Sequence, residues 1–212
     1  MTAQMQVPRP EETAEPFEAL TRFLLNAQLE DLLAGAPELC RWIPELHETV
    51  NFDQHNPHHA YDVYTHICHV TAAVPREETL RWAALLHDVG KPACFAQDET
   101  GRGHFRGHAQ VGAEMAGEIL KRLEAPEPLC TDVVWLIDHH MALLPRNETK
   151  LCAAIARDGL ARTRQLLTLK EADAHSKGVG ECQYEALFRQ LWAAMPGGSA
   201  AGQWRTVAVC ER

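Results

Sequence analysis

The sequence predicts an all-α fold, and two observations carry this prediction. Apolar residues recur at intervals of three and four along most of the chain, which is the periodicity of amphipathic helices. Hardly any stretch alternates apolar with polar residues, as a half-buried strand would. The 212 residues suffice for one domain with a sizeable core, and 46% hydrophobic with 23% charged residues is an ordinary globular composition.

The first fifty residues predict a lead-in followed by short helices. Residues 1–12, rich in proline and glutamate, are expected to be disordered. Residues 13–50 should form a short helical N-terminal segment that begins with an amphipathic helix and continues with shorter pieces at 29–33 and 36–46. The apolar stripe of the first helix consists of Phe17, Leu20, Phe23 and Leu24.

Residues 51–195 should form the main domain. It begins with a polar loop over 51–59, in which Pro57 is placed to start a helix. Helices are expected at 61–74, 77–89, 109–123, 131–142, 149–157, 160–174 and 181–194. A glycine-rich loop covers 100–104, and the glycine pair near the end predicts a flexible tail over 196–212.

Charge and cysteine content limit the classes of function. A net charge of −9 argues against broad DNA or RNA binding, which needs clustered Lys and Arg, although a local basic groove stays open. Most of the seven cysteines sit at apolar helical positions and none forms a CxxC motif, which is typical of reduced, buried thiols.

The sequence has no secretory signal pattern and no apolar stretch near about 18 residues. We therefore expect a cytoplasmic protein without a membrane partner.

The pair His87-Asp88 is the most informative feature of the chain. It directly follows the apolar run 80–86 at the end of an expected core helix. An imidazole nitrogen next to a carboxylate oxygen makes a compact clamp for a divalent transition metal. Taken alone the dipeptide proves nothing, so its meaning depends on which other side chains converge on it.

Helical periodicity turns two more metal-capable side chains toward the core. His66 lies three residues after Val63 and four before Val70, on the inward face of its helix. Asp173 continues the apolar stripe of residues 166 and 169, and a buried carboxylate needs a cation or several donors. Each histidine alone is more simply a hydrogen-bonded core residue. Together with His87-Asp88, the set favours a metal site.

The order of His66, His87-Asp88 and Asp173 resembles the H…HD…D signature of the HD-domain metal-dependent phosphohydrolases. The resemblance implies an HD-domain helical bundle with the metal site between central helices. It also implies a site for one or two divalent ions, of Mn, Ni, Co, Fe, Zn or Mg, in which these four residues bind the first ion, and it implies that the protein hydrolyses phosphate esters. Asp88 would be both a ligand and a catalytic residue.

One branch of that family is more similar still. Residues 52–66, 83–92 and 101–108 resemble the HD region of bacterial tRNA nucleotidyltransferases, the CCA-adding enzymes, and the similarity extends over about residues 36–175. Those enzymes carry a nucleotidyltransferase head with a Gly-Ser and paired-carboxylate site. Nothing in residues 1–35 resembles that head, so we do not expect nucleotidyl transfer by this chain alone.

A second ion is implied by the same resemblance, because HD enzymes with two metals use histidines at the positions of His108 and of His139-His140. His140 shares the apolar stripe of its helix and is the preferred ligand, with His139 as the runner-up. Asp88 would then lie between the two ions. His108, at the start of its helix, could instead bond to the backbone or to a substrate phosphate.

Five residues are candidates for contacting substrate. Lys91 could neutralise charge on a phosphate during reaction, or it could simply complement a helix C-terminus. Arg102, His104 and Arg106 lie on or beside the glycine-rich loop and could bind a phosphate, although a solvated loop is the simpler interpretation. His59 is expected to line the approach to the site.

The expected function is therefore metal-dependent hydrolysis of a phosphodiester or phosphomonoester. A divalent ion lowers the pKa of a bound water from roughly 15.7 toward about 7 and polarises the phosphoryl oxygen. By resemblance the partner is a small phosphorylated substrate, such as a nucleotide, a cyclic nucleotide or an RNA end. Two alternatives stay open: a non-catalytic RNA-binding or regulatory HD module, and a fragment that works with a separate nucleotidyltransferase head.

Overall fold

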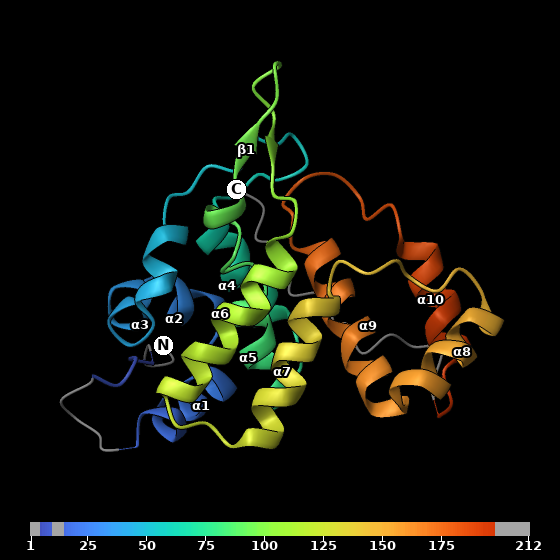
Figure 1. Ribbon diagram of the computed structural model, residues 1–212, viewed down its shortest axis with the longest axis horizontal. Helices are drawn as coiled ribbons and strands as arrows, with labels where there is room; N and C mark the ends of the chain where they lie inside the picture. Colours follow the sequence, from blue (N-terminus) through green and yellow to red (C-terminus); the bar gives the residue numbers. More distant parts are fainter. Residues whose placement is uncertain (1–4, 10–14, 198–212) are drawn as a thin grey trace.

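The computed structural model describes residues 5–9 and 15–197, and within this part it confirms the all-α fold (Figure 1). The expected lead-in over 1–12 and tail over 196–212 lie largely outside the described residues. The α-helices are α1 (Pro16–Asn26), α2 (Leu29–Ala34), α3 (Ala36–Trp42), α4 (Val63–Ala73), α5 (Glu78–Leu86), α6 (His108–Arg122), α7 (Glu127–His139), α8 (Glu148–Asp158), α9 (Leu160–His175) and α10 (Glu185–Ala194). Short 3-10 helices cover Pro44–Thr49 and Pro92–Cys94.

Helix α5 forms the centre of the bundle. All its residues from Leu80 to Leu86 are buried, and it packs against α1, α4, α7 and α9. A helix segment that is buried on every face must be surrounded by other helices. Trp82 shows how tightly it is held: the indole stacks on Phe17 with ring centroids 5.5 Å apart and donates a 2.8 Å hydrogen bond to Thr21 Oγ1.

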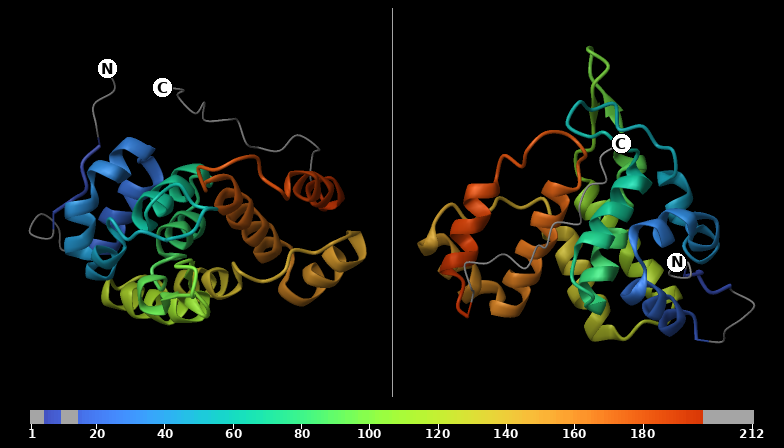
Figure 2. Two further views of the ribbon diagram at one scale, coloured as in Figure 1. Left: turned by 90° about the horizontal axis from the view of Figure 1, so that it is seen from above. Right: turned by 180° about the vertical axis from the view of Figure 1, so that it is seen from behind.

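The N-terminal helices lie on one side of this centre, α6 and α7 lie in front of it, and α8, α9 and α10 lie on the other side (Figures 1 and 2). The short N-terminal helices α1 and α2 pack on α5 and α4, and the Tyr64 hydroxyl donates to the Leu32 carbonyl at 2.9 Å. On the opposite side α8 and α10 lie against α9 around a small separate core, formed by Leu151, Leu167, Leu191 and Met195. None of the described helices combines the length and apolar character that a membrane span requires.

Two helix boundaries differ from the sequence prediction in a way that shapes the site. Pro57 does not start a helix, because α4 begins at Val63, where the Asp62 side chain accepts from the Thr65 amide at 3.0 Å and from its hydroxyl at 2.6 Å. The next helix, α5, ends at Leu86 rather than at 89, and residues 87–91 form turns. His87 and Asp88 therefore lie at the point where the chain leaves the core helix.

A hairpin that the sequence analysis missed projects from the bundle (Figure 1). Strands β1 (Ala96–Gln97) and β2 (Gly103–His104) pair antiparallel, and the turn is held by the Asp98 side chain, which accepts from the backbone amides of residues 100 and 102. Strands this short carry no readable alternation. The cysteine prediction is partly wrong: among the described cysteines, all free, only Cys68 is buried and Cys152 is exposed.

Candidate metal centre

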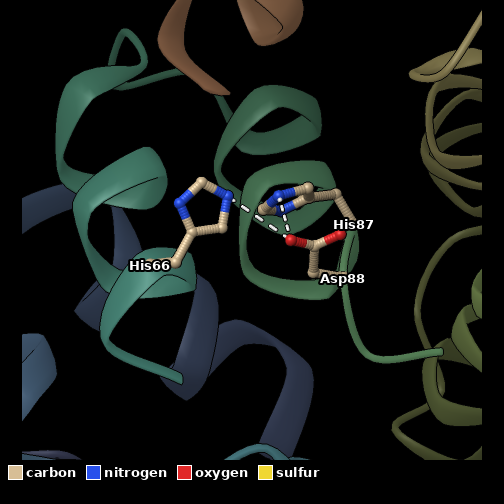
Figure 3. A group of neighbouring side chains, drawn as sticks. All are labelled: His66, His87 and Asp88. Carbon is tan, nitrogen blue, oxygen red and sulfur yellow. Dashed lines mark ion pairs between the residues drawn. The ribbon is translucent and has the colours of Figure 1, made fainter. Parts of the chain in front are cut away.

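Asp88 lies at the centre of a cluster of buried imidazoles, and its side chain is 2% exposed. Its Oδ2 atom is 3.2 Å from His87 Nε2 and 3.4 Å from His66 Nε2 (Figure 3). The other oxygen, Oδ1, is 3.4 Å from His108 Nε2 and 3.9 Å from His140 Nε2. The two carboxylate oxygens thus face two different pairs of histidines.

We call His66, His87 and Asp88 the first triad, and Asp88, His108 and His140 the second triad. Within each triad one nitrogen or oxygen atom per residue lies within 4.8 Å of the others, and all the residues are buried. Asp173 joins the first triad from α9, with its Oδ1 atom 3.2 Å from His66 Nε2. The structure therefore brings together the six residues that the sequence analysis preferred as ligands for one or two ions, without the runner-up His139.

The local backbone determines which way each imidazole faces. The Nδ1 atom of every triad histidine lies against a backbone carbonyl: 3.1 Å from Ser176 for His66, 2.8 Å from Ala84 for His87, 2.6 Å from Phe105 for His108 and 2.6 Å from Ile137 for His140. A carbonyl only accepts, so each Nδ1 carries the proton and donates. In the neutral form of each imidazole the lone pair is then on Nε2 and faces Asp88, which is the arrangement found in metal-binding histidines.

The free lone pairs test whether a cation fits this site. The Nε2 atoms of His66 and His87 are buried and make no hydrogen bond within the described part of the chain, a cost of about 1–3 kcal/mol for each such group. The Nε2 atoms of His108 and His140 lie 3.2 Å apart, so two lone pairs face each other. Imidazole nitrogens and carboxylate oxygens suit a divalent transition metal, and a cation would satisfy all four.

Burial and neighbouring charges set the ionisation of the centre, which keeps Asp88 negatively charged. Burial opposes the charged form of Asp88, but His87 and Lys91 outweigh it and hold the pKa of this carboxyl well below its usual range. Burial also acts to lower the pKa of His87, yet the charges of Asp88 and Asp173 raise it. For His140, burial dominates and lowers the pKa to about 3, so this imidazole is neutral.

A cavity of about 360 Å³ opens beside both triads. Apart from triad residues and Asp173, its polar lining consists of Asn56, His59, Lys91, His104, Arg106, Gln110 and Lys177. The structure thus places four of the five candidate substrate residues at the cavity. Arg102 does not line it and is exposed on the hairpin. Lys177 was missed by the sequence analysis, although its position four residues after Asp173 could have indicated it.

Three of the candidate ligand or substrate residues contact other side chains of the protein, which bears on the roles expected for them. The Lys91 ammonium lies 2.7 Å from Asp88 Oδ2 and is almost fully buried. His104 is engaged by Asp98 at 2.7 Å. His139 belongs to neither triad, because it is partly exposed and stacks on Trp135 with ring centroids 4.4 Å apart. The turn of the helix thus separates these adjacent histidines, and only His140 faces Asp88.

Comparisons with known proteins agree with this geometry. The chain is 40% identical over 131 residues to the A-adding tRNA nucleotidyltransferase of Deinococcus radiodurans, which covers 59% of this chain and 29% of that protein. It is 35% identical over 144 residues to the CC-adding tRNA nucleotidyltransferase of Thermus thermophilus, covering 63% and 33%. It is 31% identical over 133 residues to a bifunctional uridylyltransferase/uridylyl-removing enzyme of Mycobacterium tuberculosis, covering 58% and 15%.

The chain spans only about a third or less of the length of these relatives. The family model described as HD domain matches residues 56–178, which is more than half of the chain. This range includes both triads, Asp173 and all the residues that line the cavity. The resemblance first read from the H…HD…D order is confirmed, and the chain belongs to the HD domain family.

Proposed function

We propose that this protein is a metal-dependent phosphohydrolase that acts on a nucleotide, a cyclic nucleotide or another small phosphoester. The observation that carries the proposal is Asp88, whose two oxygens face separate histidine pairs beside a cavity. His66, His87, Asp88 and Asp173 would hold one divalent ion, and Asp88, His108 and His140 a second. Such ions lower the pKa of a coordinated water and polarise phosphoryl oxygens.

The chain's own residues prepare the site for a phosphate. Lys91 lines the cavity and would compensate negative charge that develops on the phosphoryl group. Arg106 and Lys177 add two cations to the same lining, and they suit an anionic substrate although the chain as a whole is acidic. His59 also lines the cavity, and burial lowers its pKa to about 3, so it presents a neutral imidazole.

The names of the relatives bear on the type of ester. One includes removal of a uridylyl group, and such a group is attached through a phosphodiester bond. Two are tRNA nucleotidyltransferases, which favours an RNA end as a second candidate substrate, or a module that serves a separate nucleotidyltransferase head. We expect the protein to act in the cytoplasm.

Asp88→Ala tests the proposal directly. The purified protein is assayed for metal content and for hydrolysis of a generic phosphodiester and a generic phosphomonoester, with Mn, Ni, Co, Zn, Fe and Mg added separately. We expect metal-dependent turnover that the Asp88→Ala variant loses while its circular dichroism stays helical. Unchanged turnover in the variant would contradict the proposal.

The non-catalytic module makes a different prediction in the same assay. A regulatory or RNA-binding role predicts bound metal without turnover of either ester. In that case RNA binding, and co-purification with a nucleotidyltransferase head, become the informative measurements. Turnover that depends on Asp88 would exclude the non-catalytic alternative.

A further inference from the structure

Gln54 is a buried amide whose two ends are both fixed. Only 1% of this residue is exposed, although it lies in the polar loop before α4. Its Nε2 atom donates to the Tyr61 carbonyl at 3.0 Å, and its Oε1 atom accepts from Lys91 Nζ at 2.8 Å. The carbonyl can only accept and the ammonium can only donate, so just one orientation of the amide satisfies both partners.

The Lys91 ammonium is consequently held between two oxygens. Asp88 Oδ2 lies 2.7 Å away on one side and Gln54 Oε1 2.8 Å away on the other, with the ring of Phe105 5.4 Å from the nitrogen. The two oxygens differ in character. Asp88 neutralises the ammonium, whereas the neutral amide fixes its position and leaves the charge intact. Of the two partners, only Gln54 keeps Lys91 in place without cancelling its charge.

The loop that carries Gln54 is itself fixed to the hairpin. The Gly103 amide donates to the His55 carbonyl at 2.8 Å. The backbones of the loop and the hairpin approach so closely that a Cβ atom on Gly103 would lie 2.2 Å from the Gln54 carbonyl oxygen. Phe52 of the same loop packs edge-on against Phe95, with ring centroids 5.3 Å apart. Gln54 therefore belongs to a tightly packed loop and lies behind Lys91, which lines the cavity.

We propose that Gln54 is a positioning residue that holds the Lys91 ammonium where a bound phosphate meets the metal centre. The inference rests on the proposed function, because it assigns Lys91 to a phosphate. Gln54 itself does not line the cavity. Its effect must pass through Lys91, and this dependence separates a positioning role from a general contribution to folding.

A double-mutant cycle measures that dependence. Gln54→Met keeps length and burial but removes both the acceptor for Lys91 and the donor to the Tyr61 carbonyl, and it is made alone and together with Lys91→Met, so that the cycle cancels the loss of the Tyr61 bond. With manganese and a generic phosphoester, we expect Gln54→Met to lower kcat/KM about tenfold, since hydrogen bonds to charged groups are among the stronger ones. In the Lys91→Met background the same change should have almost no effect. An equal loss in both backgrounds, or no loss in either, would overturn the inference.

Binding of inorganic phosphate repeats the cycle without turnover. Calorimetric titrations are run with and without manganese, because Lys91 supplies charge in both cases. We expect Gln54→Met to weaken phosphate binding only when Lys91 is present. Failure of the unaltered protein to bind phosphate would overturn the inference, as would additive weakening. Phosphate binding that shows the coupling without ester hydrolysis would support the role of Gln54 and contradict the proposed phosphohydrolase.

Gln97 provides a matched control on the adjoining hairpin. Its side-chain amide also donates to a backbone carbonyl, that of Gly101 at 3.2 Å, but it is exposed and does not line the cavity. Gln97→Met should leave both phosphate binding and hydrolysis unchanged. Circular dichroism and thermal unfolding of all variants verify that each one is folded.

Discussion

Lys91 and Asp88 form a buried ion pair through Asp88 Oδ2, the same oxygen that faces the two histidines of the first triad. Lys91 Nζ is 2.7 Å from Asp88 Oδ2, and this oxygen is also the one near His66 and His87. A cation that binds to Oδ2 would therefore lie close to the ammonium and be repelled by it. The Lys91 ammonium therefore opposes metal binding, although the same ammonium is proposed to compensate charge on the substrate phosphate.

Replacement of Lys91 should consequently move two properties in opposite directions. In Lys91→Met we expect manganese to bind about fivefold more tightly, which corresponds to about 1 kcal/mol of relieved repulsion. Hydrolysis should fall by at least about tenfold, because charge on the phosphate is no longer compensated. Calorimetric titration with manganese and steady-state kinetics measure the two effects. Weaker metal binding in the variant would mean that the lysine mainly supports the fold.

The second triad can be tested separately from the first. His140→Ala removes one imidazole from the second triad, whereas the first triad and Asp173 remain complete. We expect the manganese stoichiometry to fall from two ions to one. Mass spectrometry of the metal-loaded protein gives the ratio directly.

His139→Ala is the natural control for that experiment. This residue precedes His140 in the chain but stacks on Trp135, away from both triads. Its replacement should leave the stoichiometry at two. If His140→Ala also leaves two ions bound, the assignment of the second triad is wrong.

Metal affinity should rise with pH. Metal binding needs a neutral imidazole, and although burial favours the neutral form of His87, the charges of Asp88 and Asp173 raise its pKa above the ordinary value. His87 must release its proton when an ion binds, so binding weakens as the pH falls through the raised pKa of His87. His140, with a pKa of about 3, adds nothing to this dependence near neutral pH.

Titrations in two buffers of different ionisation enthalpy measure the proton release. We expect a net release on manganese binding that diminishes as the pH is raised above the pKa of His87. In His87→Gln the release should decrease. Affinity that stays constant between about pH 6 and pH 8 would contradict the assigned ionisation.

Gly90 lets the turn that bears His87 and Asp88 approach helix α6. A Cβ atom at Gly90 would lie 2.5 Å from the His108 carbonyl oxygen and 2.6 Å from the Gly112 amide nitrogen. Both are backbone atoms that cannot move independently, so Gly90→Ala should destabilise the protein by about 1–3 kcal/mol. It should also separate Asp88 from His108 and lower the occupancy of the second triad. Urea unfolding and metal content measure these two effects.

Gly117→Ala serves as the comparison within α6. A Cβ atom there meets nothing closer than Val134 Cγ2 at 3.7 Å, an ordinary contact. This change should be neutral, or stabilising by up to about 1 kcal/mol because alanine favours a helix. Equal effects of the two substitutions would show that the close approach at Gly90 does not matter.

Helical periodicity explains why much of the site could be anticipated. His66 and His140 lie on apolar stripes, and the 3.6-residue repeat alone predicts that they face inward. The same repeat separates His140 from its neighbour His139. That Asp88 lies between two pairs of histidines was suggested by family resemblance and not by spacing, because spacing within one helix contains no information about distance to another.

The contacts that hold Lys91 beside the cavity could not be predicted in this way. Gln54 lies in a loop without periodicity, and its partner Lys91 is 37 residues away in the chain. The backbone approach between Gly103 and Gln54 is equally invisible in a single sequence. The misplaced start of the helix after Pro57 has the same origin: Asp62 supplies the N-cap, and the preceding loop is shaped by contacts with the hairpin.

The hydrogen bonds that orient the four imidazoles differ in how far apart their two partners lie in the sequence. His87, His108 and His140 each bond to the carbonyl three residues earlier, whereas His66 bonds to Ser176, 110 residues later and just beyond α9. Three of the orientations are therefore encoded locally, but that of His66 exists only when the end of α9 has docked on α4. We therefore expect an ion bound at the first triad to stabilise the docked position of the end of α9, because both depend on the orientation of the His66 imidazole.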